Sequence, residues 1–303
     1  MTHAQARPTS RSAGHGSGVI VIGAHRSGTS LLAGLLRALR VHIGHDCAAH
    51  EESTFFRGIN VRLLRSVGAS WYRPEPMEAA LRSPSQRERL ARRLRTEVSS
   101  PGCRQYLGDG ASDGPLSIEA QGRAWGWKDP RSTVTLPLWL GQFPDARVIH
   151  IVRNGIDVAR SLVERERATP RRRFDGVRFM VKRHWPSRWP DAERKARPFR
   201  DLREAFELWA TYVRLGGDAT RSLGHDRLLV VRYEDMLADP GPSVQQVAAL
   251  VGQPAGLAAV ERWVDSVNSD RRYAFVDAPA GRQLLDELGD HAMMRRFGYD
   301  RTR

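Results

Sequence analysis

Residues 19–36 read VIVIGAHRSGTSLLAGLL: a short apolar run, a loop bounded by Gly23 and Gly28, and a second apolar run with helical spacing. This order predicts a strand, a loop and a helix, an arrangement that points backbone N–H groups and a helix N-terminus at an anion. The loop has the length of a nucleotide-binding P-loop, but Thr29 stands where that motif has its lysine. That lysine would reach the β- and γ-phosphates of ATP or GTP. We therefore expect the loop to hold one phosphate and its close neighbours, with Arg26 adding positive charge.

Length and composition limit the class of protein. The 303 residues are enough for one large α/β domain or two small ones, and 41% of them are hydrophobic. No apolar run reaches the roughly 18 residues of a membrane span. Residues 1–17 are polar and basic and lack the apolar centre of a secretory signal. We expect a disordered tail over 1–17 and a single domain over 18–303.

Cysteine and histidine spacing argues against metal chemistry. Cys47 and Cys103 stand in no metal-binding or redox spacing, which is typical of incidental thiols in a reducing compartment. His42, His45 and His50 cluster in the sequence, but a zinc site would need a fourth ligand. We therefore predict a cytoplasmic protein that holds no metal ion.

The net charge of +14 is concentrated in one part of the chain. Residues 165–203 contain 14 basic and 5 acidic residues, with tryptophans interleaved. Three interpretations of this stretch stay open: a solvated lid, a surface that binds an acidic or glycan acceptor, and a nucleic-acid patch. We expect a basic helical insertion over residues 165–225 that covers the acceptor site, because substrate-selecting parts commonly lie on such segments.

Strand and helix patterns alternate along the rest of the chain. Short apolar runs predict further strands at 124–127, 147–152 and 227–231. Apolar residues at helical spacing predict helices at 53–67, 77–98, 156–167, 201–222, 243–252, 256–267 and 281–295. The aromatic residues Phe206, Trp209 and Tyr212 are predicted to face the core. Because such alternation is typical of a parallel sheet with right-handed crossovers, we predict an α/β protein with a P-loop-like three-layer fold, in which helices flank a central parallel sheet.

Polar residues follow each predicted strand at its carboxyl end. The loop 23–30 follows the first strand, Lys128 and Asp129 follow the second, Arg153 follows the third and Tyr233 the fourth. Ligands bind parallel sheets beyond the carboxyl ends of the strands. We therefore expect these residues to converge on one crevice.

The loop 23–30, GAHRSGTS, resembles the 5′-phosphosulfate loop of sulfotransferases that use 3′-phosphoadenosine 5′-phosphosulfate (PAPS) as donor. Arg153 at a strand end, with Ser161 eight residues later on the next helix, is similar to the 3′-phosphate motif of the same superfamily. Arg165 matches a second 3′-phosphate arginine of the tyrosylprotein-type branch. The two motifs together imply a site for both phosphates of the donor.

Two further segments resemble this family. Residues 127–130, WKDP, are similar to the Lys-Asp-Pro segment of the tyrosylprotein branch. Residues 231–235, VRYED, resemble an Arg-Tyr-Glu segment whose tyrosine lies near the adenine. The similarity spans about residues 18–240, and the whole pattern looks most like bacterial sulfotransferases of unassigned acceptor.

The resemblance implies an enzyme that transfers a sulfuryl group from PAPS to a hydroxyl, or an amine, of a small molecule or glycan, and releases adenosine 3′,5′-bisphosphate. Donor binding is then expected from His25, Arg26, Ser27, Gly28, Thr29, Ser30, Arg153, Ser161, Arg165 and Tyr233. Arg26 and Lys128 are expected to be catalytic, because they can neutralise the negative charge that grows on the departing phosphate oxygen. In-line transfer of this kind demands no metal.

The acceptor hydroxyl needs a base, and the resemblance suggests a carboxylate or histidine shortly after the loop helix. The candidates are Glu52, Glu51, Asp46 and His45. In the tyrosylprotein branch the base belongs to a Gly-Glu-Glu segment; the same register falls here at His45-Asp46, where this sequence departs from the pattern. We favour Glu52 as the catalytic base. His25 could face the acceptor from inside the loop or make a structural contact.

Two other functions are compatible with parts of the sequence. A P-loop kinase-like phosphotransferase would use the same loop, but the loop lacks its lysine and no strand is followed by an evident Mg²⁺ carboxylate. A non-enzymatic nucleic-acid-binding protein would use the Arg-rich stretch and would not need the spacing of Arg153 and Ser161. We expect no nucleic-acid partner, and the sequence leaves the acceptor and the oligomeric state open.

Overall fold

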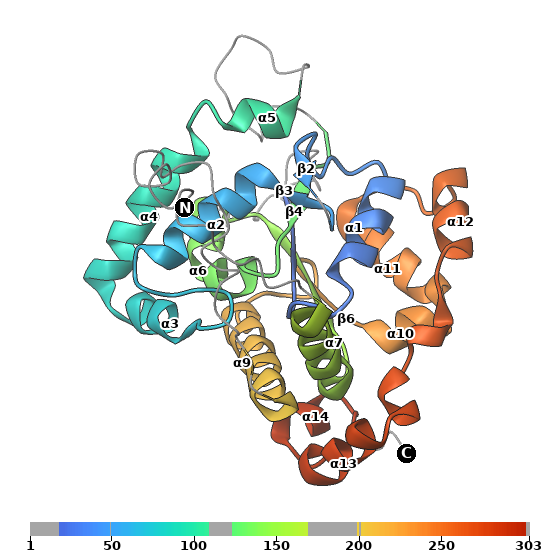
Figure 1. The fold of residues 1–303 in the computed structure, drawn as a ribbon. Coiled ribbons are helices and arrows are strands. Elements are labelled where there is room, and N and C mark those ends of the chain that lie inside the picture. The colour runs from blue at the N-terminus through green and yellow to red at the C-terminus, as the bar shows by residue number, and fades with distance from the viewer. Residues whose placement is uncertain (1–17, 49, 109–122, 169–198, 200, 301–303) are drawn as a thin grey trace, which may run out of the picture.

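The computed structural model describes residues 18–48, 50–108, 123–168, 199 and 201–300. Within these residues, four parallel strands form a central sheet with the order β4-β1-β5-β6 (Figure 1). The strands are β1 (Val19–Ile22), β4 (Gly126–Lys128), β5 (Arg147–Val152) and β6 (Leu228–Arg232). Ile20 of β1 pairs with Trp127 on one side and with Val148 on the other. The predicted parallel sheet is confirmed.

Helices cover both faces of the sheet. Ile20 and Ile22 of β1 belong to one core and Val19 and Val21 to the other, because successive side chains of a strand point to opposite faces. The first face packs against α2 (Thr54–Arg65), α4 (Pro84–Val98), α6 (Ser132–Gln142), α7 (Gly155–Ala168) and α9 (Leu202–Thr220) (Figure 1). The second packs against α1 (Thr29–Ala38), α10 (Tyr233–Ala238), α11 (Pro240–Val251) and α12 (Ala258–Asp265). This double covering explains why the strands are apolar runs and confirms the three-layer fold.

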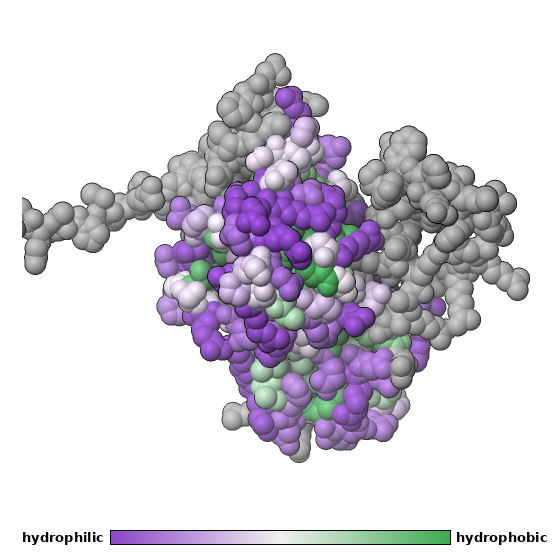
Figure 2. Space-filling model, turned by 90° about the vertical axis from the view of Figure 1, so that its left-hand side faces the viewer, coloured by the Kyte–Doolittle hydropathy of each residue, from purple (hydrophilic) through white to green (hydrophobic). Residues whose placement is uncertain are grey.

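The segment 77–98, predicted as one helix, is divided into α3 (Glu75–Arg82) and α4. Ser83 between them is extended, with φ −83° and ψ 116°. The ring of Pro84 disfavours helical backbone at the residue before it, which accounts for the break. Figure 2 shows that the face bearing α3 and α4 is predominantly hydrophilic, as the arginines and glutamates of α4 predict.

Helix α9 packs along α7 and buries Phe206, Trp209 and Tyr212, so the predicted aromatic core stripe is confirmed. The side chain of Asp201 caps its N-terminus by accepting a hydrogen bond from the backbone N–H of Glu204. This helix is the last part of the predicted insertion over 165–225. Residues 169–198 and 200 of that insertion, like the predicted tail over 1–17, lie outside the described residues.

The chain after α12 returns to the carboxyl edge of the sheet. It forms η4 (Ser269–Arg271), η5 (Ala274–Asp277), α13 (Pro279–Leu288) and α14 (Ala292–Arg296). The hydroxyl of Tyr299 donates to Glu234 Oε2 at 2.6 Å and lies 3.2 Å from the carbonyl oxygen of Val152. Glu234 Oε1 accepts a hydrogen bond from the N–H of Asn154 at 2.8 Å. The buried Glu234 therefore ties the ends of β5 and β6 to the C-terminal segment.

Between α1 and α2 the chain forms a short antiparallel pair, β2 (Cys47–Ala48) and β3 (Glu52–Ser53), and α5 (Cys103–Leu107) follows α4. Ser53 Oγ accepts a hydrogen bond from the N–H of Phe56 at 3.3 Å and so caps the N-terminus of α2. No helix in the described ranges combines the length and the apolarity that crossing a bilayer requires.

Candidate active site

The loop between β1 and α1 has the conformation of an anion-binding turn. Arg26 and Gly28 have left-handed backbone, with φ 71° and φ 94°, and Ser27 Oγ donates to the carbonyl oxygen of Ala24 at 2.6 Å. Gly28 is the N-cap of α1 and provides no side-chain cap, which leaves the first amides of the helix to a ligand. A Cβ on Gly28 would overlap the ring of Tyr233, so the position requires glycine for space as well as for its backbone angle.

A cavity of about 510 Å³ opens beside this loop. Ten of the twelve predicted site residues line it: His25, Arg26, Gly28, Thr29, Ser30, Glu52, Lys128, Arg153, Arg165 and Tyr233. Ser27 and Ser161 do not, but Ser161 Oγ accepts a hydrogen bond from Nε of Arg26 at 2.8 Å. The residues that follow the four strands therefore share one crevice, as expected from a parallel sheet.

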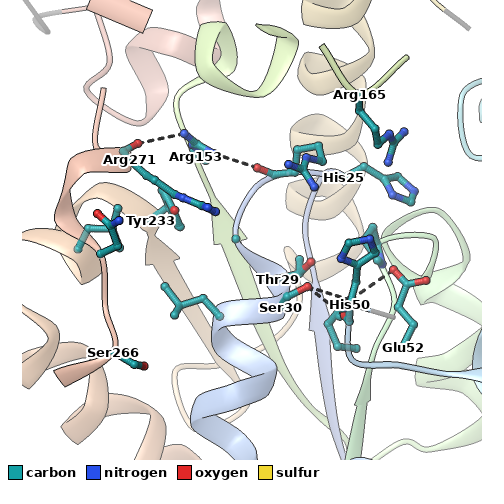
Figure 3. A pocket seen from close by; sticks show the side chains of 17 residues that line it. His25, Thr29, Ser30, His50, Glu52, Arg153, Arg165, Tyr233, Ser266 and Arg271 are labelled. Carbon is teal, nitrogen blue, oxygen red and sulfur yellow. Dashed lines mark hydrogen bonds and ion pairs between the residues drawn. The ribbon is translucent and has the colours of Figure 1, made fainter. Parts of the chain in front are cut away.

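Arg153, which follows β5, forms one end of the cavity. Its Nη1 donates to the carbonyl oxygen of Arg26 at 3.4 Å, and its Nη2 donates to that of Arg271 at 3.0 Å (Figure 3). Its guanidinium lies 4.6 Å from the centroid of the Tyr233 ring. Asp157, four residues on in α7, lies 3.5 Å from Nη2. These contacts fix a cation directly beside the loop.

Lys128 ends β4 and is 1% exposed. Its Nζ lies 3.4 Å from Ser30 Oγ and 3.3 Å from Glu52 Oε1. Glu52 Oε2 lies 3.5 Å from Nη1 of Arg131. Burial lowers the pKa of Lys128, and the carboxylates of Glu52 and Asp129 oppose that shift. A buried amine is thus held next to the start of α1, where charge interactions are stronger than in water.

Asp129 fixes the turn that follows Lys128. Asn60 Nδ2 donates to Asp129 Oδ2 at 2.8 Å and to Ser132 Oγ at 3.0 Å. The backbone N–H of Arg131 donates to Asp129 Oδ1 at 3.0 Å. Because buried polar groups with satisfied hydrogen bonds are rigid, this network sets the position of Lys128 relative to α2.

Four residues were predicted as candidate bases. Of these four, which the structure describes, only Glu52 lines the cavity. Glu51 pairs with Arg37 on the surface at 2.6 Å. Asp46 Oδ2 accepts hydrogen bonds from two hydroxyls and a backbone N–H at the start of α2. His45 is bonded through its backbone N–H to α5. The contacts of Glu51, Asp46 and His45 are therefore structural and lie outside the cavity lining, whereas Glu52 faces the cavity.

Arg165 and His25 form the other side of the cavity. The Arg165 guanidinium lies 5.0 Å from the Trp71 ring centroid, and the His25 ring lies 4.6 Å from the same ring. Figure 3 shows both side chains on the side of Glu52, opposite Arg153. The structure thus separates Arg165 from Arg153, and a joint 3′-phosphate site of these two residues stays a prediction.

His25 is 9% exposed. Burial lowers its pKa well below the ordinary 6.5, and the nearby cations lower it further. In order of effect these cations are Arg131, Arg165, Lys128 and Arg26. The imidazole is therefore neutral near pH 7.

Seven lining residues were not anticipated: Leu31, His50, Pro130, Leu237, Ser266, Asn268 and Arg271. The last three come from the segment before η4 and from η4 itself. The N–H of Phe275 donates to Asp157 Oδ1 at 2.9 Å and Arg160 donates to the carbonyl oxygen of Ala274 at 2.7 Å, which anchors the following η5 to α7. No motif marks this segment; its single local signal is Asn268, which caps η4 through the N–H of Asp270.

The cavity is strongly cationic. Its described lining contains five arginine and lysine side chains and one carboxylate, Glu52. Cations stand at both ends, and the amide-bearing loop lies between them. This arrangement suits an elongated polyanion with phosphate groups at separate positions.

Comparisons with known proteins found a matching family model and solved structures of similar fold. The model of a family described as "Sulfotransferase family" matches residues 18–255. A search of curated proteins found no significant match. Among solved structures, a sulfotransferase from Alicyclobacillus acidocaldarius is 17% identical with a TM-score of 0.50, over 95% of this chain and 97% of that one. The sulfotransferase domain of the Synechococcus PCC 7002 olefin synthase is 19% identical with a TM-score of 0.46, over 84% and 81%. At such identities the likeness concerns the fold alone.

Proposed function

The chain belongs to the sulfotransferase family, and we propose that it transfers a sulfuryl group from PAPS to a hydroxyl, or an amine, of a small molecule or glycan. The second product is adenosine 3′,5′-bisphosphate. One observation carries the proposal: Nη1 of Arg153 lies 3.4 Å from the carbonyl oxygen of Arg26, so the strand-end arginine and the phosphate loop border one cavity. A nucleotide with two separated phosphates can therefore reach both.

The 5′-phosphosulfate end of the donor is assigned to the loop. The first amides of α1, with the hydroxyls of Thr29 and Ser30, hold the phosphate at a helix N-terminus. Arg26 and Lys128 both line the cavity and supply positive charge. Nζ of Lys128 lies 3.4 Å from Ser30 Oγ, close enough to the start of α1 to neutralise negative charge that develops on the phosphate oxygen.

The 3′-phosphate end is assigned to Arg153, with Arg271 beside it. Both lie on the Tyr233 side of the cavity (Figure 3). Ser161, which lies on α7 after Arg153, is assigned to the same end, and it accepts a hydrogen bond from Arg26 of the loop. Charge-assisted bonds from guanidinium groups to phosphate are among the strong ones in proteins, so this end orients the donor.

The adenine is assigned to the part of the cavity beside Tyr233. Leu31 and Leu237 give this part of the cavity apolar walls, and Ser266 and Asn268 add polar groups. Pockets of this kind, largely apolar with a few placed polar groups, are typical of nucleoside sites.

The proposed reaction is an in-line displacement. A bond forms between the acceptor oxygen and sulfur, the S–O bond to the 5′-phosphate breaks, and its electron pair stays on the phosphate oxygen. Arg26 and Lys128 neutralise that oxygen; removing one such donor costs about 3–4 kcal/mol in other enzymes. The acceptor proton passes to a group of the cavity, where Glu52 offers a carboxylate and His25 an imidazole.

A kinase-like function has less support in the same cavity. Mg²⁺ in nucleotide sites prefers carboxylate and water ligands, but Glu52 is already paired with Lys128 and Arg131. Nucleic-acid binding has no support among the described residues, and most of the basic stretch lies outside them. Both cysteines are free thiols, which fits the proposed cytoplasmic location.

Ligand-dependent unfolding tests the proposed function. Adenosine 3′,5′-bisphosphate at about 100 times its Kd should raise the free energy of unfolding by about 2.7 kcal/mol. ATP with Mg²⁺ and a single-stranded oligonucleotide are the comparison ligands. Stabilisation by ATP–Mg²⁺ without stabilisation by the bisphosphate would favour the kinase, and transfer of label from ³⁵S-PAPS then identifies acceptors.

A further inference from the structure

His25 is a buried histidine that lines the cavity on the side of Glu52 and Arg165, and one of its ring nitrogens has no partner among the described residues. Its side chain lines the cavity and is 9% exposed. Its Nε2 has no hydrogen-bond partner among the described residues. Leaving a buried polar atom unpaired costs about 1–3 kcal/mol, so such an atom points to a ligand that completes it.

The imidazole is fixed in place by aromatic neighbours. Its ring centroid lies 4.6 Å from that of Trp71 and 6.0 Å from that of Tyr212. Tyr212 Oη donates to the carbonyl oxygen of Trp71 at 2.7 Å, and both aromatic residues are buried. Because the neighbours are themselves anchored, the ring has little freedom to reorient.

The charge around His25 selects what Nε2 can bind. Arg131, Arg165, Lys128 and Arg26 all act on the ring, and Tyr212 is the titratable group of α9 beside it. A neutral imidazole nitrogen without a proton needs a hydrogen-bond donor. A protonated amine would meet four cations here, whereas the O–H of a neutral or anionic acceptor would not be repelled.

Glu52 is held in two ion pairs, whereas Nε2 of His25 has no partner among the described residues. Its oxygens lie 3.3 Å from Nζ of Lys128 and 3.5 Å from Nη1 of Arg131. Its carboxylate is therefore already engaged by two cations, which hold it in place. Glu52 therefore suits a positioning residue for Lys128.

We propose that Nε2 of His25 accepts the hydrogen bond, and then the proton, of the acceptor hydroxyl during sulfuryl transfer. This inference rests on the proposed function. As the acceptor oxygen bonds to sulfur, its proton moves to Nε2, and the electron pair of the broken S–O bond stays on the phosphate. The imidazolium returns the proton to solvent after the products leave.

Donor binding makes the imidazole more basic. The phosphates and the sulfonate of PAPS bring negative charge into a cluster of cations that disfavours imidazolium. Opposite charge nearby favours the protonated form, so the pKa of His25 rises when the donor site is filled. The proton acceptor is thus competent only in the loaded cavity.

An acceptor series tests this role by kinetics. With ³⁵S-PAPS, His25→Gln should lower kcat by roughly 100-fold or more for phenol, which ionises near pH 10. The loss should be much smaller for 4-nitrophenol, assayed above its pKa, because this acceptor has already lost its proton. Benzylamine should give no sulfamate where phenol gives the sulfate ester. Equal losses for both phenols, or sulfamate at the rate of the ester, would overturn the inference.

Imidazole NMR tests it without any acceptor. In the free protein, Nε2 of His25 should lack a proton near pH 7, and addition of adenosine 3′,5′-bisphosphate should raise the pKa of His25 by about one unit or more. The exposed His225 is the control signal and His225→Gln the control variant. A proton on Nε2 in the free protein, or an unchanged pKa on binding, would contradict the inference. If the wild-type protein binds no bisphosphate, the proposed function itself fails; if it binds while the His25 results are negative, only this inference fails.

Discussion

Nε of Arg26 donates to Oγ of Ser161 at 2.8 Å, which joins the phosphate loop to helix α7 across 135 positions of the sequence. Nη1 of Arg153 makes a second link, to the carbonyl oxygen of Arg26. The two anion-binding motifs are therefore coupled through one residue of the loop. Because the two motifs are held next to each other in this way, one ligand with two phosphates can contact both at once.

Arg153→Ala should weaken the binding of adenosine 3′,5′-bisphosphate. Losing a hydrogen bond to a charged group costs about 1.5–3 kcal/mol, which is roughly a 10- to 100-fold rise in Kd. Isothermal titration calorimetry measures this rise in Kd. Arg167→Ala, which removes an exposed arginine from α7, the helix that follows Arg153, is the control and should leave Kd unchanged. An unaltered Kd for Arg153→Ala would remove the assigned 3′-phosphate site.

Lys128→Met should separate binding from turnover. Because the charge of Lys128 is needed most when the phosphate oxygen leaves, kcat should fall by roughly 100- to 1,000-fold. The Kd of the bisphosphate should change much less. Single-turnover kinetics with ³⁵S-PAPS measures the first and titration the second. Equal losses in both would mean that Lys128 only holds the donor.

Gly28→Ala should lose donor binding for a steric reason. A Cβ at Gly28 overlaps Tyr233 and the backbone has φ 94°, whereas Gly252 has φ 67° with open space around it. Both alanine variants should lose about 1–3 kcal/mol of stability from backbone strain. Only Gly28→Ala should also lose bisphosphate binding; the same Kd in both variants would show that the loop tolerates the methyl group.

His150 should make the fold sensitive to acid. It is buried in β5, and burial lowers its pKa from 6.5 to about 4. The folded state thus favours the neutral ring, so the stabilisation is complete above pH 6.5 and is lost as the pH falls towards 4. The full loss in the free energy of unfolding from this histidine is about 3 kcal/mol.

Urea unfolding at a series of pH values measures this contribution. His150→Leu should show a shallower fall in the free energy of unfolding across the same range, whatever its absolute stability. His25 and His42, whose pKa values are also lowered, account for part of the remaining slope. An unchanged slope in His150→Leu would show that this histidine does not titrate as described.

The sheet and the crevice could be predicted because their signals are local. Parallel strands covered on both faces are apolar runs, and polar residues such as Lys128 and Arg153 follow them where the strand ends meet. The break at Ser83 was missed because the apolar spacing continues across it, although Pro84 is a known helix boundary.

Other parts of the site depend on long-range packing. Arg271 reaches the cavity because η5 is bonded to α7, a contact between segments more than 100 residues apart. The side chain of Arg165 lies on Trp71 rather than beside Arg153, and its sequence spacing alone does not determine that direction. Sequence can therefore place a residue on an element, while the partner of its side chain is decided by the tertiary fold.

The central claim is that the cavity holds the 5′-phosphate and the 3′-phosphate of the donor at separate sites. The most direct test compares adenosine 3′,5′-bisphosphate with adenosine 5′-monophosphate, which lacks the 3′-phosphate, by isothermal titration calorimetry. The account predicts that the bisphosphate binds at least about 10-fold more tightly to the wild-type protein. It also predicts that this difference disappears in Arg153→Ala. Equal affinities of the wild-type protein for the two nucleotides would contradict it.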